Sequence, residues 1–148
     1  MSDILDLGAW ADALLAQLDA PARRKLMRAI ATELRDQQRR RIAEQQNPDG
    51  SAYEPRKPQL RQRPGRLRRA MFIRLRTGKH LKASAGADGA VVKFFGGAQR
   101  LAAVHHFGLR DRVNKAGLEV TYPRRRLLGF GDADVERIKD LLFIQLRK

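Results

Sequence analysis

The chain has 148 residues and no cysteine, and its 31 Lys and Arg against 16 Asp and Glu give a formal net charge of +15. This length suits a single domain, and the lack of cysteine excludes disulfides and thiolate metal sites. No apolar run could span a bilayer, and the acidic first twenty residues are unlike a secretory signal, so we expect a soluble intracellular protein without membrane contact. The positive net charge predicts binding to an acidic partner or to a polyanion.

Residues 1–46 are predicted to form an N-terminal helical region. An apolar stripe at three- and four-residue spacing predicts a short first helix, and its members are Leu7, Trp10, Leu14 and Leu18. Asp19 is a candidate cap for a second helix, and Pro21 suits the first turn of that helix. A second stripe predicts that it runs to about Gln46, and its members are Leu26, Met27, Ile30, Leu34 and Ile42. Its opposite face is rich in arginine, and such faces are more often solvated than bound.

Residues 47–65 hold four of the six prolines and show no apolar periodicity. A stretch of this kind buries too little apolar surface to order itself. We predict a flexible, proline-rich loop that becomes ordered only in an assembly. Residues 66–148 are predicted to form an α+β core that ends in a helix, and the whole chain is expected to be a single domain.

Within this core, the spacing of Leu67, Met71 and Leu75, widened by Phe72, predicts a helix that ends at Gly78. Residues 80–97 read as two strands around a Gly-Ala-Asp-Gly turn. Residues 117–123 alternate between apolar and polar and predict a further strand, with Leu118, Val120 and Tyr122 on one side. A terminal helix follows, with acids in its first turn, and its core-facing residues are Val135, Ile138, Leu142 and Leu146. The predicted class is therefore α+β, with N-terminal helices, a small antiparallel sheet and a C-terminal helix.

The adjacent residues His105 and His106 are the first candidates for chemistry. Adjacent histidines point in different directions on a helix or strand, so a shared metal ion is awkward. The three serines and the third histidine, His80, stand in contexts that suggest no nucleophile and no further ligand. We therefore predict no enzyme, no catalytic residue, no metal and no cofactor. One histidine is expected to pack and form a hydrogen bond while the other is exposed.

Two other function classes remain open at this point. A basic DNA-binding protein is the stronger one, because the arginine supply is generous, although the interleaved aromatics typical of single-strand binders are few. A small metal-dependent nuclease has only the histidine pair to support it. Salt-dependent binding to duplex DNA would favour the first, and activity lost with chelator would favour the second.

Four stretches in a fixed order carry a resemblance to a known family. They are "RIAEQQNPDGSAYEPRK", "RRAMFIRLRTGKHLKA", "LAAVHHFGLRDRV" and "VTYPRRRLLGFGDADVERIKDLL". With this order and spacing, the chain resembles the tail completion, or virion morphogenesis, proteins of contractile-tailed bacteriophages. The resemblance covers roughly residues 35–146.

The resemblance implies a structural virion protein that completes the phage tail at its head-proximal end, as a tail terminator or neck ring, and supports head-tail joining. It implies a homo-oligomer, a ring of six, that contacts the tail tube or terminator and the connector proteins and that can touch phage DNA transiently. Such a protein would be assembled in the host cytoplasm and reside in the virion.

On the same reading, His106, Phe107 and Gly108 are architectural. Phe107 is expected to enter the core, Gly108 to permit a tight turn and the histidine to bond to nearby backbone. The arginines after Pro123 would orient three core candidates, Leu127, Leu128 and Phe130. We expect contacts to partners or neighbouring copies from exposed arginines, and the candidates are Arg39, Arg40, Arg41, Arg110, Arg124 and Arg125.

Overall fold

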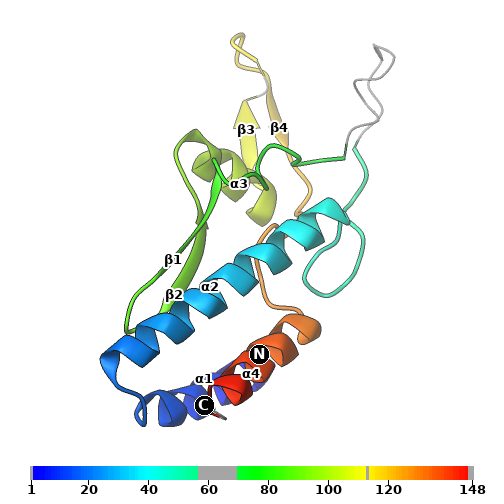
Figure 1. Cartoon of the computed structure of the whole chain (residues 1–148). Helices are drawn as coiled ribbons and strands as arrows, with labels where there is room; N and C mark the ends of the chain where they lie inside the picture. The colour runs from blue at the N-terminus through cyan, green and yellow to red at the C-terminus, as the bar shows by residue number, and fades with distance from the viewer. Residues whose placement is uncertain (1, 57–69, 113, 147–148) are drawn as a thin grey trace. The chain divides into compact units, whose positions relative to one another are not determined.

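The computed structural model describes residues 2–56, 70–112 and 114–146, and of residues 2–7, 11 and 146 it describes the backbone alone. The elements in chain order are α1 (Ser2–Leu15), α2 (Ala20–Ala43), β1 (Leu81–Ala85), β2 (Ala90–Phe94), α3 (Gly97–Phe107), β3 (Arg110–Arg112), β4 (Glu119–Thr121) and α4 (Asp132–Leu146) (Figure 1). The predicted α+β class, with N-terminal helices and a C-terminal helix, is confirmed. The strands form two separate two-stranded sheets, β1 with β2 and β3 with β4. None of the described helices is long and apolar enough to cross a membrane.

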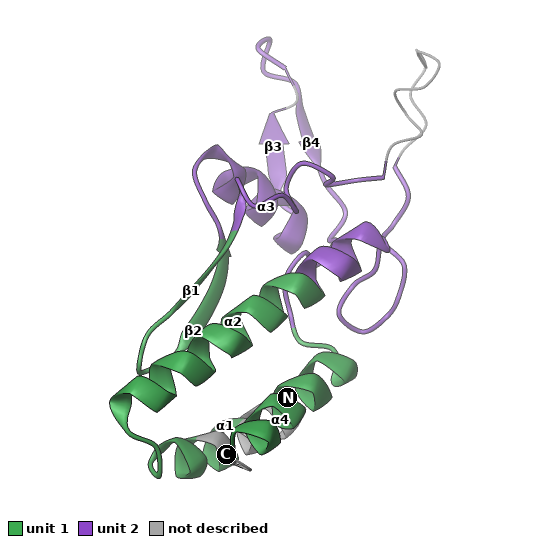
Figure 2. Cartoon of the chain, viewed as in Figure 1, with its two compact units in different colours: residues 1–37, 82–93, 130–148 green, residues 38–81, 94–129 purple. Residues whose placement is uncertain are grey.

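The chain folds into two compact units, each built from separated segments (Figure 2). Unit 1 comprises residues 1–37, 82–93 and 130–148, and unit 2 comprises residues 38–81 and 94–129. The boundaries predicted from the sequence, at residues 46 and 65, stay predictions.

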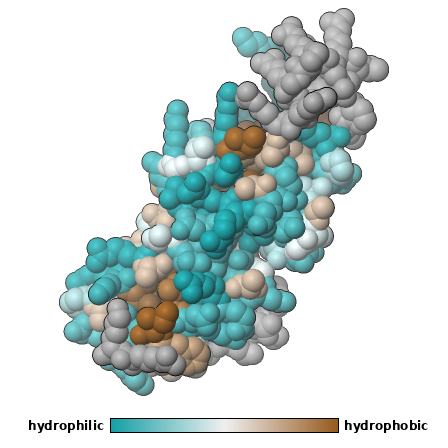
Figure 3. All heavy atoms as spheres, turned by 45° about the vertical axis from the view of Figure 1, so that its right-hand side comes forward, coloured by the Kyte–Doolittle hydropathy of each residue, from teal (hydrophilic) through white to brown (hydrophobic). Residues whose placement is uncertain are grey.

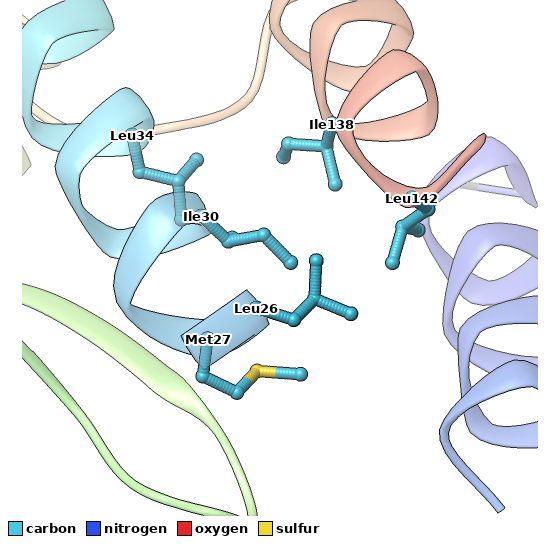
Figure 4. Packing of buried hydrophobic residues seen from close by; sticks show 6 residues of the cluster. All are labelled: Leu26, Met27, Ile30, Leu34, Ile138 and Leu142. Atoms are coloured by element: carbon cyan, nitrogen blue, oxygen red, sulfur yellow. The ribbon is translucent and has the colours of Figure 1, made fainter. Parts of the chain in front are cut away.

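The core of unit 1 lies between α2 and α4. Its buried members are Leu26, Met27, Ile30, Leu34, Ile138 and Leu142, and in Figure 4 the side chains of the two helices point toward one another. This confirms the predicted apolar stripe of α2 and places Ile138 and Leu142 in the core as expected. Burial of each such side chain stabilises the fold by roughly 1.5–3 kcal/mol.

Smaller elements cover this core. Trp10, Leu14 and Leu18 of the first predicted stripe pack against it. The indole of Trp10 also meets the ring of Phe143, with centroids 5.2 Å apart. From the β1–β2 hairpin, Ala90 and Val92 complete the cover. The side chains of Leu7 and Leu146, predicted to point the same way, lie outside the described residues.

The predicted cap of α2, the predicted acids in the first turn of α4 and the predicted hairpin turn are present. The backbone N–H of Ala22 donates to Oδ1 of Asp19 at 2.9 Å, so Asp19 caps α2. The N–H of Gly131 donates to Oδ2 of Asp134 at 2.8 Å, and Asp132 and Asp134 stand in the first turn of α4, where acids offset the helix dipole. The N–H of Gly86 donates to the carbonyl of Gly89 at 2.9 Å across the Gly-Ala-Asp-Gly turn.

The helix predicted at residues 66–78 is wrong for its described part. Residues 71–76 form turns, and Phe72 has a φ of 66°, which no helix accommodates. Gln45 holds this segment in place, because its side-chain amide donates to the carbonyl of Met71 at 2.9 Å and accepts from the N–H of Met71 at 2.8 Å. Leu75 is still buried. The apolar spacing therefore predicted the burial of Leu75 correctly but the conformation of its backbone incorrectly. Residues 66–69 of the prediction lie outside the described residues.

The predicted loop at residues 47–65 is described only as far as Arg56. Its first part packs, since Tyr53 is buried and residue Gln46 pairs with Ala52 in an isolated bridge. Asn47 donates from Nδ2 to the carbonyls of Ser51 and Ala52, both at 3.3 Å. Tyr53 is thus one residue of this stretch that packs, while the flexibility of residues 47–65 and their ordering in an assembly stay predictions. A single buried side chain such as Tyr53 creates no apolar periodicity, so the sequence pattern did not predict its burial.

Candidate functional site

The net charge of the chain belongs to unit 2. Unit 2 holds 20 of the 31 Lys and Arg and 5 of the 16 Asp and Glu, a formal charge of +15, while unit 1 holds 11 of each sign and is neutral. On the face shown in Figure 3, hydrophilic atoms dominate and apolar atoms gather in small areas. A surface that attracts an acidic partner or a polyanion is therefore expected on unit 2.

The His-Phe-Gly motif ends α3. Gly108 adopts the left-handed conformation, with φ 67° and ψ 50°, and the N–H of Leu109 donates to the carbonyl of Val104 at 2.8 Å. A Cβ at Gly108 would lie 3.0 Å from the backbone nitrogen of Arg124. The predicted turn role of Gly108 is confirmed, and the close approach of residue 124 adds a second reason for glycine. Phe107 is 61% exposed, so its predicted place in the core is wrong.

The segment that follows β4 is bound to this end of α3. The N–H of Tyr122 donates to the carbonyl of Leu109 at 3.1 Å, and the N–H of Arg125 donates to the carbonyl of His105 at 2.9 Å. Nδ1 of His106 accepts from the N–H of Leu127 at 3.2 Å. The predicted bond between the motif histidine and nearby backbone is confirmed. It joins two parts of the chain that are about twenty residues apart.

His105 lies among aromatic rings rather than among ligands. Its ring centroid is 5.0 Å from that of Phe72 and 4.6 Å from that of Tyr122, and its Nδ1 is buried. Burial, then the charge of Arg125, lowers the pKa of His105 below the ordinary value, against a smaller opposing effect of Asp111. Both histidines are half-buried, so the expectation that one of them is exposed is wrong.

The histidine pair offers little to a metal ion in this arrangement. Burial, with help from Arg126 and Arg124, lowers the pKa of His106, and its Nδ1 already accepts a backbone hydrogen bond. Within the described residues, no group of three or more His, Asp and Glu side chains could hold a metal ion. The lowered pKa of both rings disfavours their charged forms, and the printed contact of His106 is to backbone.

Two of the predicted interface arginines are buried. Arg125 is 4% exposed, and its Nε donates to the carbonyl of Glu54 at 2.7 Å while a terminal nitrogen donates to the carbonyl of Pro55 at 3.2 Å. Arg41 is 8% exposed and donates to the carbonyl of Gly129 at 2.9 Å and to the side-chain oxygen of Gln38. The expectation that Arg125 lies near the surface is wrong. A guanidinium can satisfy several carbonyls at once, so an arginine-rich run can be internal bracing as well as surface.

The other predicted interface residues lie toward solvent. Arg40 and Arg124 are exposed, and Arg39 is half-buried. Arg110 is exposed and its Nε lies 2.8 Å from a carboxylate oxygen of Glu119 across the β3–β4 hairpin. Of the core candidates near this run, Leu127 is fully buried and Leu128 half-buried, but Phe130 is 45% exposed and its predicted place in the core is wrong. All six predicted arginines belong to unit 2, and their role at an interface stays a prediction.

Unit 2 also contains an open groove, which no pattern in the sequence predicts. Its volume is about 1220 Å³, and its walls come from residues 54–56, residues 70–75, α3 and the strand β4 with the residues after it. Ile73 and Leu101 line it and remain 37% and 47% exposed. Leu101 follows the buried Ala98 by three residues, so helical periodicity alone predicts that Leu101 is buried in the core. The sequence therefore carries no signal that separates this groove wall from core.

Comparison with known proteins places these features in a family context. A family model described as the phage virion morphogenesis family matches residues 3–147. The chain is 38% identical over 137 residues to the tail completion protein S of Escherichia phage P2, and the match covers 91% of each chain. No solved structure matches.

Proposed function

The chain belongs to the phage virion morphogenesis family, and we propose from this premise that it is a structural, non-enzymatic protein that completes the phage tail. The observation that carries the proposal is the match to a tail completion protein over nine-tenths of both chains. The finer proposal is that it acts at the head-proximal end of the tail, as a terminator or neck ring, and supports head-tail joining.

A ring suits the charge distribution of the chain. A tail tube repeats one surface around its axis, so a protein that closes the tube can satisfy every copy only by repeating with the same symmetry. Six copies would gather a charge of roughly +90, which opposes closure unless acidic surfaces intervene. We therefore propose a ring, with six copies as the working number, that forms readily on acidic tail or connector proteins and is weak in isolation.

The neutral character of unit 1 sharpens this proposal. Because unit 2 holds the whole net charge, contacts with acidic partners belong to unit 2, and contacts of unit 1 should depend little on salt. The same charge would also serve a basic DNA-binding protein, which is the second candidate function. The two differ in what they bind at near-physiological ionic strength.

Deletion of the gene in the phage that carries it tests tail completion. We expect lysates with filled heads and unattached tails under the electron microscope, and we expect the plasmid-borne chain to restore joined particles. A gold label on the restored protein should lie at the head-proximal end of the tail. Intact virions without the gene would refute the proposal, and a label at the distal end would refute the neck position alone.

A second experiment separates tail binding from DNA binding. Purified protein is mixed with tails or with random duplex DNA over a salt series, and bound protein is measured by sedimentation. The proposal expects binding to tails that weakens with salt but persists at near-physiological ionic strength. Tight binding to DNA under the same conditions, without binding to tails, would favour the DNA-binding alternative.

A further inference from the structure

We propose that the groove of unit 2 binds an extended segment of an acidic protein, and that this segment adds to β4 as a further strand. The inference rests on the proposed function only for the source of the partner, which would be a tail or connector protein. Its chemistry rests on three features of unit 2: an unpaired strand edge, an apolar wall and a basic rim.

The register of the β3–β4 hairpin shows which backbone groups of β4 face outward. The pairs are Arg110 with Thr121, Asp111 with Val120, and Arg112 with Glu119. The N–H of Tyr122 donates to Leu109, so the pair beyond these three is hydrogen-bonded. Hydrogen-bonded and non-hydrogen-bonded pairs alternate along an antiparallel ladder. The N–H and C=O groups of Thr121 and Glu119 therefore point away from β3.

These outward groups lie next to the groove. Thr121 lines it, as do its neighbours Val120 and Tyr122. Among the described residues, none of the backbone hydrogen bonds made outside the helices and strands involves the N–H or the carbonyl of Thr121. An edge of this kind is a template for another strand. Pro123 follows without an N–H, so the template is short and the register of an added strand would be fixed.

The apolar wall suits alternate side chains of an added strand. Val120 and Tyr122 share one side of β4 by the period of two, and Leu101 and Ile73 supply exposed apolar surface in the same groove. At about 1220 Å³ the groove exceeds the roughly 300–1,000 Å³ of ordinary small-molecule pockets. Strand addition combines these elements, because backbone bonds give affinity and pockets for alternate side chains give selectivity.

The rim indicates the charge of the occupant. Arg56 and Arg74 line the groove and are exposed, and Glu54 is the one acidic residue among its described lining. A segment in which apolar residues alternate with Asp or Glu would place its acids toward these arginines and toward solvent. The sugar-phosphate exterior of a duplex would leave Leu101 and Ile73 uncovered, and a nucleic acid has no backbone amides to pair with the edge of β4, which is why we favour a protein segment.

Fluorescence anisotropy with synthetic peptides tests this proposal on the full-length protein. The probe is a short labelled peptide in which valine alternates with glutamate. Its controls have the same composition in two blocks, or lysine in place of glutamate, and labelled single-stranded DNA is the non-protein control. We expect binding of the alternating acidic peptide only, and roughly tenfold weaker binding after Leu101→Ser. The matched control Leu118→Ser, at a residue that is 59% exposed and outside the groove, should bind as the unchanged protein does.

Two further changes examine strand addition itself. Thr121→Pro removes the outward N–H, and Thr121→Val retains it; we expect a roughly tenfold loss for the first and little change for the second. Methylation of alternate amides in the peptide, which removes the partner's donors without altering the protein, should abolish binding in one register and spare it in the other. Failure of the acidic peptide to bind, binding unaffected by Leu101→Ser, equal effects of both methylation registers, or DNA binding lost with the same variants would each overturn the proposal. None of these outcomes depends on whether the deletion phage makes complete tails.

Discussion

Nδ1 of His106 accepts a hydrogen bond from the backbone N–H of Leu127 at 3.2 Å, and this bond joins the end of α3 to the segment after β4. Since Nδ1 is the acceptor, the neutral ring carries its proton on Nε2. The longer contact from the N–H of Leu128, at 3.5 Å, reaches the same atom. His106 therefore stabilises unit 2 by binding to its backbone.

Replacement of His106 separates the acceptor from the ring. His106→Leu leaves the N–H of Leu127 without its partner, and we expect a loss of about 1–3 kcal/mol in the free energy of unfolding. His106→Asn places an amide oxygen near the position of Nδ1 and should lose less. Urea unfolding followed by circular dichroism measures both variants. Equal losses in the two variants would show that the acceptor is unimportant.

The histidines also predict a pH dependence. Burial is the main cause that lowers the pKa of both, so below the ordinary value of 6.5 the unfolded chain binds more protons than the folded chain. Their contribution to stability is complete above pH 6.5 and is lost as the pH falls through the lower folded-state pKa values. The charged groups that face them are Arg125 and Asp111 for His105, and Arg126 and Arg124 for His106.

Urea midpoints measured from above neutrality down to about pH 5 should therefore fall on the acid side. The variant His106→Asn should flatten the part of the curve that belongs to this residue. A midpoint that rises with acid in the unchanged protein would contradict the structural reading. So would a curve that the variant leaves unaltered.

Glycine substitutions distinguish backbone strain from close contact. Gly108→Ala meets both, because φ is 67° and Arg124 lies 3.0 Å from the new Cβ. Gly117→Ala meets the strain alone, with φ 90° and open space around it, and Gly86→Ala meets neither. We expect losses of about 2–4 kcal/mol, about 1 kcal/mol and close to zero in that order. Thermal unfolding gives the ranking, and equal values for the first two would remove the role assigned to the contact.

Periodicity predicted the core of unit 1 well for a physical reason. Leu26, Ile30 and Leu34 recur at the helix period and face α4, so one local rule fixes both the element and its buried face. The acids of α4 and the cap at Asp19 are equally local signals. The class and the helix order follow from them.

Unit 2 could not be predicted in the same way, because its structure depends on contacts between distant residues. The turn at Phe72 depends on the side chain of Gln45, and the place of Arg125 depends on the carbonyls of Glu54 and Pro55. No spacing rule connects such pairs. From sequence alone, a run of arginines is predicted to lie on the surface, because the carbonyls that bind Arg125 are not known. In the same way Leu101 is predicted to lie in the core, because its exposure is not known.

Charge reversal at two adjacent arginines tests the distinction that the structure draws between them. Arg124 is exposed, whereas Arg125 is buried and binds two backbone carbonyls. In Arg125→Glu a carboxylate would replace the donor and face those carbonyls, with an expected loss of about 3 kcal/mol or more. Arg124→Glu should change the free energy of unfolding by less than about 0.5 kcal/mol. On the proposed function, Arg124→Glu should still weaken co-sedimentation with tails, most clearly at low salt, because the charge of unit 2 faces an acidic partner.

Arg137→Glu is the control for a general effect of charge. Arg137 is exposed, belongs to neutral unit 1 and pairs with Glu33 at 3.5 Å, so this change should leave attachment to tails nearly unchanged. A folded Arg125→Glu protein of full stability would contradict the bracing role. An Arg124→Glu protein that binds tails as tightly as the unchanged chain would remove Arg124 from the interface.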